Sequence, residues 1–151
     1  MANVYNFFKF LEDKADRRVP LRLKLLNDPE SITEKDLYVK GTLDLEKTNI
    51  EILPDNLDIE GALYLDYTPI KTLPKNLKVG GTLSLTDSSI EKLPKDLEVE
   101  GDLNIRNTPL ANKYLDRFSV GQLRWSNKEA YAEDQVIKSI AYLGGSVYLH
   151  K

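Results

Sequence analysis

The carboxylates in the central part of the chain are the first candidates for chemistry. Asp44, Glu46, Asp66 and Asp102 stand at polar positions of a recurring pattern. Two carboxyl groups within reach of each other could act as the pair of a glycoside hydrolase. Such a pair needs a water-excluding site that raises one pKa, and nothing in the sequence predicts one. Carbohydrate hydrolysis is therefore the least favoured of three functional hypotheses.

Residues for other kinds of catalysis are scarce. The 151-residue sequence has no cysteine, which excludes thiolate zinc sites and cysteine nucleophiles. His150 is the single histidine, so a histidine metal cluster and a histidine-based triad are excluded as well. No glycine-rich loop leads into a helix with a lysine, as a phosphate site would require. We therefore expect no enzyme activity, no metal and no cofactor.

The side chains that suit binding are tyrosines and arginines, the types enriched at interface hot spots. Together with the acidic and amide residues that share their outward positions, they form a set of candidate partner-binding residues. The set consists of Asp44, Glu46, Tyr64, Asp66, Tyr67, Asn104, Arg106, Arg124 and Tyr148. It is acidic at its first members and basic at its last. The alternative is a face that is merely solvated.

Composition limits the partners. The formal net charge is -3, and no basic stripe is visible that would predict binding to DNA or RNA. No run of about 18 apolar residues predicts a membrane span, and the start of the sequence lacks a signal-peptide pattern. The sequence therefore predicts a cytoplasmic protein that binds neither nucleic acid nor membrane.

The elements that position the candidate residues come from a repeat. Gly41, Gly61, Gly81 and Gly101 recur every 20 residues, and the apolar residues around them recur with the same spacing. The unit Leu53 to Thr72 has the pattern L-P-x-x-L-x-[IV]-x-G-x-L-x-L-x-x-[TS]-x-I-x-x, which returns from Leu73 to Lys92. A period of this length is typical of a solenoid.

Within one unit, small or apolar residues occupy alternate positions, as in a strand with one buried face. They are Leu57, Ile59, Gly61, Leu63 and Leu65. We expect each unit to be one strand plus a compact return that begins at a Leu-Pro pair. The inward hydroxyls of Thr48, Thr68, Ser88 and Thr108 are interpreted as a structural ladder bonded to nearby backbone. The glycine marks either a bend or a close approach of neighbouring backbone.

The pattern L-x-L-x-x-[TN]-x-[IL]-x-x-L-P resembles the short leucine-rich repeats of bacterial and tailed-phage proteins, over roughly residues 37 to 125. The resemblance implies an α/β solenoid with a parallel β-sheet on its concave face. Two departures are Glu60 in place of a leucine and the Val or Ile residues that precede each glycine. The longer alternation that these produce keeps a right-handed parallel β-helix as the alternative fold.

We expect a single domain over residues 1–151. Residues 1–36 form an N-terminal cap with a degenerate repeat, in which a helix contains Val4 to Leu11 and Leu23 and Leu25 align with inward strand positions. Residues 37–120 form the regular repeats. Residues 121–151 form a last repeat and cap. In that cap a strand contains Gly121, Leu123 and Trp125, a helix ends near Leu143, and a final strand lies around Val147 to Leu149.

A capped repeat scaffold without catalytic residues favours a non-enzymatic protein-binding module. The resemblance further suggests a phage-encoded inhibitor that blocks a host protein, such as a defence factor, in the cytoplasm of a bacterial cell. A virion or assembly component is the alternative. The final strand is an uncovered edge, which suggests a homodimer formed through that edge.

Overall fold

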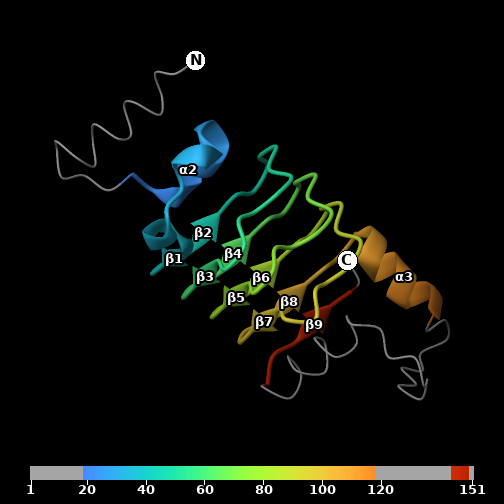
Figure 1. Ribbon diagram of the computed structural model, residues 1–151. Coiled ribbons are helices and arrows are strands. Elements are labelled where there is room, and N and C mark those ends of the chain that lie inside the picture. The colour runs from blue at the N-terminus through green and yellow to red at the C-terminus, as the bar shows by residue number, and fades with distance from the viewer. Residues whose placement is uncertain (1–18, 118–143, 150–151) are drawn as a thin grey trace, which may run out of the picture.

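The computed structural model describes residues 19–117 and 144–149, and its regular part is two parallel sheets (Figure 1). The four-stranded sheet has the order β1 (Tyr38–Val39), β3 (Asp58–Ile59), β5 (Lys78–Val79), β7 (Glu98–Val99). The five-stranded sheet has the order β2 (Leu43–Asp44), β4 (Leu63–Tyr64), β6 (Leu83–Ser84), β8 (Leu103–Asn104), β9 (Val147–Tyr148). Each 20-residue unit thus supplies one strand to each sheet.

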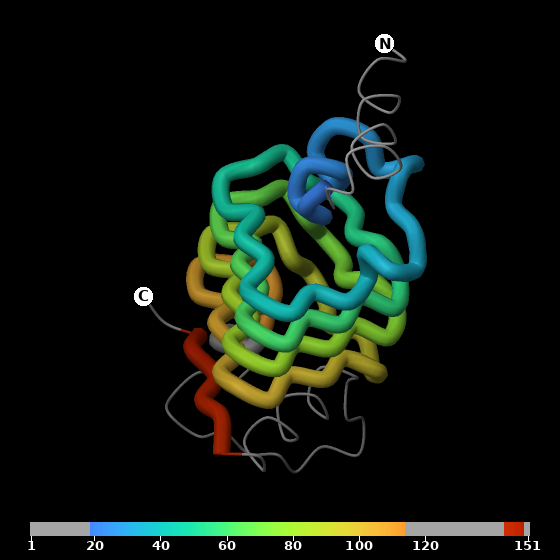
Figure 2. The backbone as a smooth tube through the Cα atoms, turned by 90° about the vertical axis from the view of Figure 1, so that its left-hand side faces the viewer, coloured from blue at the N-terminus to red at the C-terminus, as the bar shows by residue number. Residues whose placement is uncertain are grey.

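The prediction of a solenoid is confirmed, since the turns of the chain stack on one another as a coil (Figure 2). Each strand from β1 to β6 pairs in parallel with the strand 20 residues later, as Leu63 does with Leu83. The expectation of one continuous strand per unit is wrong. Residues 60–62 bend the backbone and divide the predicted strand of their unit into β3 and β4. The equivalent residues divide the strand of each other unit in the same way. The result is a parallel-strand β-solenoid, with its few helices at the ends of the described ranges.

The repeated glycine lies where successive turns come closest. Gly61 N–H donates to Gly41 O at 3.1 Å, Gly81 N–H to Gly61 O at 2.9 Å, and Gly101 N–H to Gly81 O at 3.2 Å. A Cβ atom on Gly81 would lie 3.0 Å from the carbonyl carbon of Gly61, and one on Gly101 would lie 2.7 Å from Gly81 O. Both sequence explanations of the glycine therefore apply, because the chain bends there and the neighbouring backbone leaves no room for a side chain.

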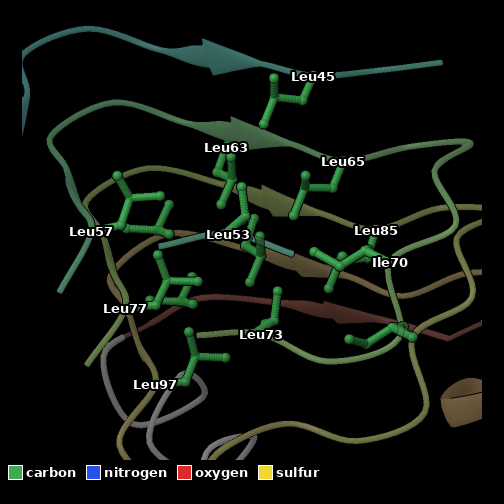
Figure 3. Close-up of a cluster of buried hydrophobic side chains, with 14 of the residues drawn as sticks. Leu45, Leu53, Leu57, Leu63, Leu65, Ile70, Leu73, Leu77, Leu85 and Leu97 are labelled. Atoms are coloured by element: carbon green, nitrogen blue, oxygen red, sulfur yellow. The ribbon is translucent and has the colours of Figure 1, made fainter. Parts of the chain in front are cut away.

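The core lies between the sheets and the return segments (Figure 3). Leu63 comes from a strand and Leu65 from the position directly after it, while Ile70 and Leu77 come from the return segments. All four side chains are fully buried. Burying one such side chain contributes roughly 1.5–3 kcal/mol. Because each side chain packs against its copies in the turns above and below, the core is shared by all units.

The inward hydroxyls are bonded as a structural ladder requires. Thr48 Oγ1 donates to Leu45 O at 2.8 Å, Thr68 Oγ1 to Leu65 O at 2.7 Å, and Thr108 Oγ1 to Ile105 O at 2.6 Å. The fourth hydroxyl, that of Ser88, is buried without a hydrogen-bond partner among the described residues. The ladder prediction is thus confirmed at three of its four positions.

Before the first strand the chain forms α2 (Leu21–Asn27) and two short 3-10 helices, η1 (Pro29–Ser31) and η2 (Glu34–Leu37). Leu21 and Leu25 join the core, whereas Leu23 is 40% exposed. The alignment of Leu23 with an inward strand position is therefore wrong, because residues two apart in a helix point to different sides. The helix predicted from Val4 to Leu11 lies outside the described residues.

After β8 the chain forms α3 (Pro109–Arg117). The predicted strand at Gly121 to Trp125 and the helix ending near Leu143 lie outside the described residues. The predicted final strand is present as β9, but it pairs directly with β8, with Leu103 opposite Val147. The expected insertion of another strand between them is therefore wrong. Among the described helices, none has the length and apolar character needed to cross a membrane.

A buried ion pair fixes the segment before β1. The Lys24 ammonium lies 2.9 Å from a carboxylate oxygen of Asp36, and both side chains are buried. The same Asp36 oxygen accepts hydrogen bonds from Thr33 N–H at 2.8 Å and Thr33 Oγ1 at 3.1 Å. Burial acts to raise the pKa of Asp36, but the Thr33 N–H and the Lys24 charge outweigh it and hold this pKa below its ordinary value.

Replacing the glycine that touches the preceding turn should destabilise the solenoid. We expect Gly81→Ala to lower the free energy of unfolding by about 1–3 kcal/mol, because the new methyl group meets the Gly61 backbone. Gly41→Ala is the matched control, since a Cβ there has nothing within 4 Å. Urea unfolding measures both, and equal losses at the two positions would contradict the close-approach explanation.

Removing the carboxylate that faces Lys24 should cost stability in a pH-dependent way. We expect Asp36→Asn to lower the free energy of unfolding by about 3–5 kcal/mol at pH 7, because the buried Lys24–Asp36 ion pair is broken. A depressed carboxyl pKa stabilises the fold above the ordinary aspartate value of about 3.9, and this contribution is lost as the pH falls below it.

The difference between wild type and Asp36→Asn should therefore shrink below about pH 4. Urea unfolding at a series of pH values tests this. The exposed Asp58→Asn is the control and should change little. A difference that stays constant from neutral to acid pH would show that the carboxylate charge is not the cause.

Candidate functional site

The outward side of the five-stranded sheet, together with the residues that directly follow its strands, forms the candidate site, which we call the five-strand face. Its first column is Asp44, Tyr64, Ser84, Asn104 and Tyr148, in the register of the paired strands. Its second column is Glu46, Asp66, Thr86 and Arg106, held in the same register by backbone hydrogen bonds between turns. The inward leucines hold these outward side chains in two straight rows.

The β2 and β4 end of the face is acidic and internally bonded. Asp44 Oδ1 accepts Glu46 N–H at 3.0 Å. Asp66 Oδ1 accepts Ser84 Oγ at 2.5 Å and Thr86 N–H at 2.7 Å. A hydrogen bond with Asp66, then desolvation, then the Asp44 charge raise the pKa of Glu46. Three carboxylates thus crowd together, and the crowding favours a cation beside them.

The β8 and β9 end of the face is built on a cation–π pair. The Arg106 guanidinium carbon lies 4.6 Å from the ring centroid of Tyr148. Arg106 N–H donates to Asn104 Oδ1 at 3.2 Å, which orients the backbone beneath the pair. Arg106 Nε is buried and has no hydrogen-bond partner among the described residues. The stack holds a guanidinium in one place and leaves one of its donors unused.

Tyr67 lies in the turn that borders the acidic end. Lys47, Tyr67, Asp87 and Asn107 occupy equivalent turn positions, all with φ between 55° and 58°. Asn and Asp tolerate this left-handed conformation, whereas a bulky tyrosine rarely adopts it. The Tyr67 side chain is 55% exposed, and Lys47 Nζ lies 5.7 Å from its ring centroid. An exposed aromatic ring is thus held at a position where it costs stability.

The structure brings most of the predicted site residues together. Asp44, Glu46, Tyr64, Asp66, Asn104, Arg106 and Tyr148 lie on the five-strand face, and Tyr67 lies at its border. Arg124 lies outside the described residues. The predicted strand around Gly121 to Trp125, which would carry Arg124, does not lie beside β8, because Tyr148 pairs with Asn104 there. The Arg106–Tyr148 stack follows from this pairing, and the regular 20-residue spacing did not predict it.

A hollow on the four-stranded sheet was not predicted from the sequence. It has a volume of about 330 Å³ over the four-stranded sheet and is bordered by Tyr38, Glu60, Gly80 and Glu100. Tyr38 Oη donates to Glu60 at 2.8 Å, and this hydrogen bond raises the pKa of Tyr38. The sequence contained a signal for this hollow. Three units of the repeat have a charged residue at one equivalent position, Lys40, Glu60 and Glu100, whereas the remaining unit has Gly80 there.

Metal and cofactor ligands are not grouped in the described ranges. No set of three or more histidine or acidic residues there is placed to hold a metal ion. On the five-strand face, Asp66 Oδ1 already accepts two hydrogen bonds from its own chain. The arrangement therefore suits contact with the charged and aromatic groups of a partner.

Comparison with known proteins gives no identification. No protein-family model, curated protein or solved structure matches this chain.

Replacing the strained tyrosine should stabilise the protein. We expect Tyr67→Asn to raise the free energy of unfolding by about 1 kcal/mol, since asparagine accepts the left-handed turn that Asn107 already adopts. Tyr64→Asn is the control, because asparagine at that strand position loses packing and should lower stability. Thermal unfolding compares the two, and a loss of stability in Tyr67→Asn would remove the argument from strain.

Proposed function

We propose that this chain is a non-enzymatic protein-binding module and that the five-strand face contacts the partner. The observation that carries the proposal is Tyr67, an exposed aromatic residue kept in a left-handed turn. A bulky residue that strains the backbone and leaves more than half of its surface exposed is best explained by a role outside folding. The acidic end and the Arg106–Tyr148 stack support the same face, because arginine and tyrosine are frequent interface anchors.

We further propose that the solenoid belongs to the short leucine-rich-repeat class. In this class it has helical caps at its ends, and its binding side lies on the five-stranded parallel sheet. The 20-residue spacing of leucines and the packing of Leu21 and Leu25 from α2 against the core support this class. The narrower form of the proposal, a phage-encoded inhibitor of a host defence protein in the bacterial cytoplasm, rests on the resemblance of the repeats alone.

The size of the face constrains the mode of binding. Five strands about 4.8 Å apart span about 19 Å, and two strand residues plus the two that follow them at about 3.3 Å each give about 13 Å, hence a surface of roughly 250 Å². A standard interface buries about 800 Å² on each partner. A tight partner must therefore also contact a flank of the solenoid, or two copies of the chain must act together. Pairing between β9 edge strands is one arrangement that would join two copies.

One observation favours carbohydrate hydrolysis as the second candidate, namely the hydrogen bond of Glu46 to Asp66 and the raised pKa of Glu46. Paired carboxyls with separated pKa values are typical of glycoside hydrolases. Glu46 is exposed, however, and the pair has no enclosed site around it. Glu46→Gln would abolish hydrolysis by this pair, so any activity that survives the substitution has another origin.

Capture of a partner tests the main proposal. We expect the tagged protein to retain a specific partner from a bacterial lysate, and Tyr64→Ala together with Arg106→Glu to reduce this capture by about tenfold or more, as hot-spot losses do. Lys78→Glu is the matched control, since it makes the same charge change on the exposed side of the four-stranded sheet. Equal capture by the face variant and the control would place the binding surface elsewhere.

A further inference from the structure

We propose that the five-strand face binds an extended protein segment in which a basic residue and an acidic residue stand four positions apart. The inference rests on the proposed function and deepens it by giving the chemistry of the partner. It follows from the opposite charges at the two ends of the face, the fixed distance between them and the small residues in the middle.

The acidic end selects the basic residue. Asp44, Glu46 and Asp66 lie on adjacent strands, and their crowding already shifts the pKa of Glu46 upward. A lysine or arginine from a partner would relieve this repulsion. Tyr67 extends the same end with an exposed ring, and Lys47 shows that a cation is accommodated near it. Carboxylates beside an aromatic ring form an environment that attracts cations.

The basic end selects the acidic residue. Arg106 is stacked on Tyr148, so little side-chain entropy remains to be lost when the guanidinium binds. A guanidinium donates in a planar fork that matches the two oxygens of a carboxylate. A partner aspartate or glutamate reaching this edge would pair with the stacked guanidinium.

Strand spacing sets the distance between the two selected residues. Glu46 and Arg106 are separated by three strand steps of about 4.8 Å, hence about 14 Å. In an extended segment the side chains at positions i and i+4 point to the same side and lie about 13 Å apart. A segment that crosses the strands can therefore place its basic residue at Glu46 and its acidic residue at Arg106 when the two are four positions apart. Residues two positions apart are too close together to reach both.

The middle of the face leaves room for such a segment. Ser84 is 5% exposed, and its hydroxyl is bonded to Asp66, so it does not project. Thr86 follows it in the second column, while Tyr64 and Asn104 flank Ser84 in the first. A small side chain at position i+2 of the segment would lie over this low middle. The occupant expected is thus an extended stretch with a charged residue at each end and a small residue at its centre.

Peptide titration followed by NMR of the isotopically labelled full chain tests the proposal. The probe is the blocked pentapeptide Lys-Ala-Ser-Ala-Glu, and the controls are Lys-Ala-Ser-Ala-Lys and the tripeptide Lys-Ala-Glu. We expect saturable shifts at Glu46, Arg106 and Tyr148 with the probe, and about threefold to tenfold weaker binding of both controls, since each control misses one charge contact. Binding should also weaken with added salt.

Charge exchange in the protein gives the second readout. We expect Glu46→Lys and Arg106→Glu to weaken binding of the probe when introduced singly, and the double variant to recover part of it, because the peptide can then bind in the reverse direction. Equal binding of all three peptides, shifts confined to other surfaces, or no saturable binding would overturn the inference. In those cases, lysate capture that still depends on Tyr64 and Arg106 would leave the proposed function standing.

Discussion

The backbone contact between neighbouring turns is the constraint on which the rest of the structure depends. Gly61, Gly81 and Gly101 each donate to the glycine one turn earlier, at distances that exclude a side chain. This contact fixes the offset at 20 residues, so that each leucine lies over its own copy and each outward residue lies over the outward residue of the previous turn. The columns of the five-strand face are thus a consequence of the same contact that forms the core.

The solenoid could be predicted because its cause is periodic. Alternating Leu57, Ile59, Leu63 and Leu65, repeated at a constant interval, have few other ways to become buried. The division of each strand into two was not predicted, since alternation of side chains is the same on both sides of a bend. Leu23 was misplaced for a related reason, because Leu23 and Leu25 align with the inward strand positions one period later although the chain there forms α2.

The candidate site was predictable only in part. The outward positions of Asp44, Tyr64 and Arg106 follow directly from the repeat. The pairing of β9 with β8 does not, because the 20-residue spacing ends after β8 and Asn104 is followed in the sheet by Tyr148. The left-handed backbone of Tyr67 was also beyond the sequence argument, although Asp87 and Asn107 at the equivalent turn positions were a signal for it.

Core and surface are under different constraints in such a fold. Every inward side chain must fit its copies in the neighbouring turns, whereas an outward residue can differ from its copies without disturbing the stack. Tyr67 is an outward residue whose left-handed backbone even costs stability. The outward departures from the repeat on the five-strand face are proposed to form the binding surface.

Site-specific photo-crosslinking with the captured partner tests this claim most directly. The photoreactive residue p-benzoylphenylalanine would replace Tyr64 on the face or, separately, Ile52, which is 78% exposed on a return segment. The account predicts a covalent adduct with the partner from position 64 and none from position 52. An adduct from position 52 together with none from position 64 would contradict it.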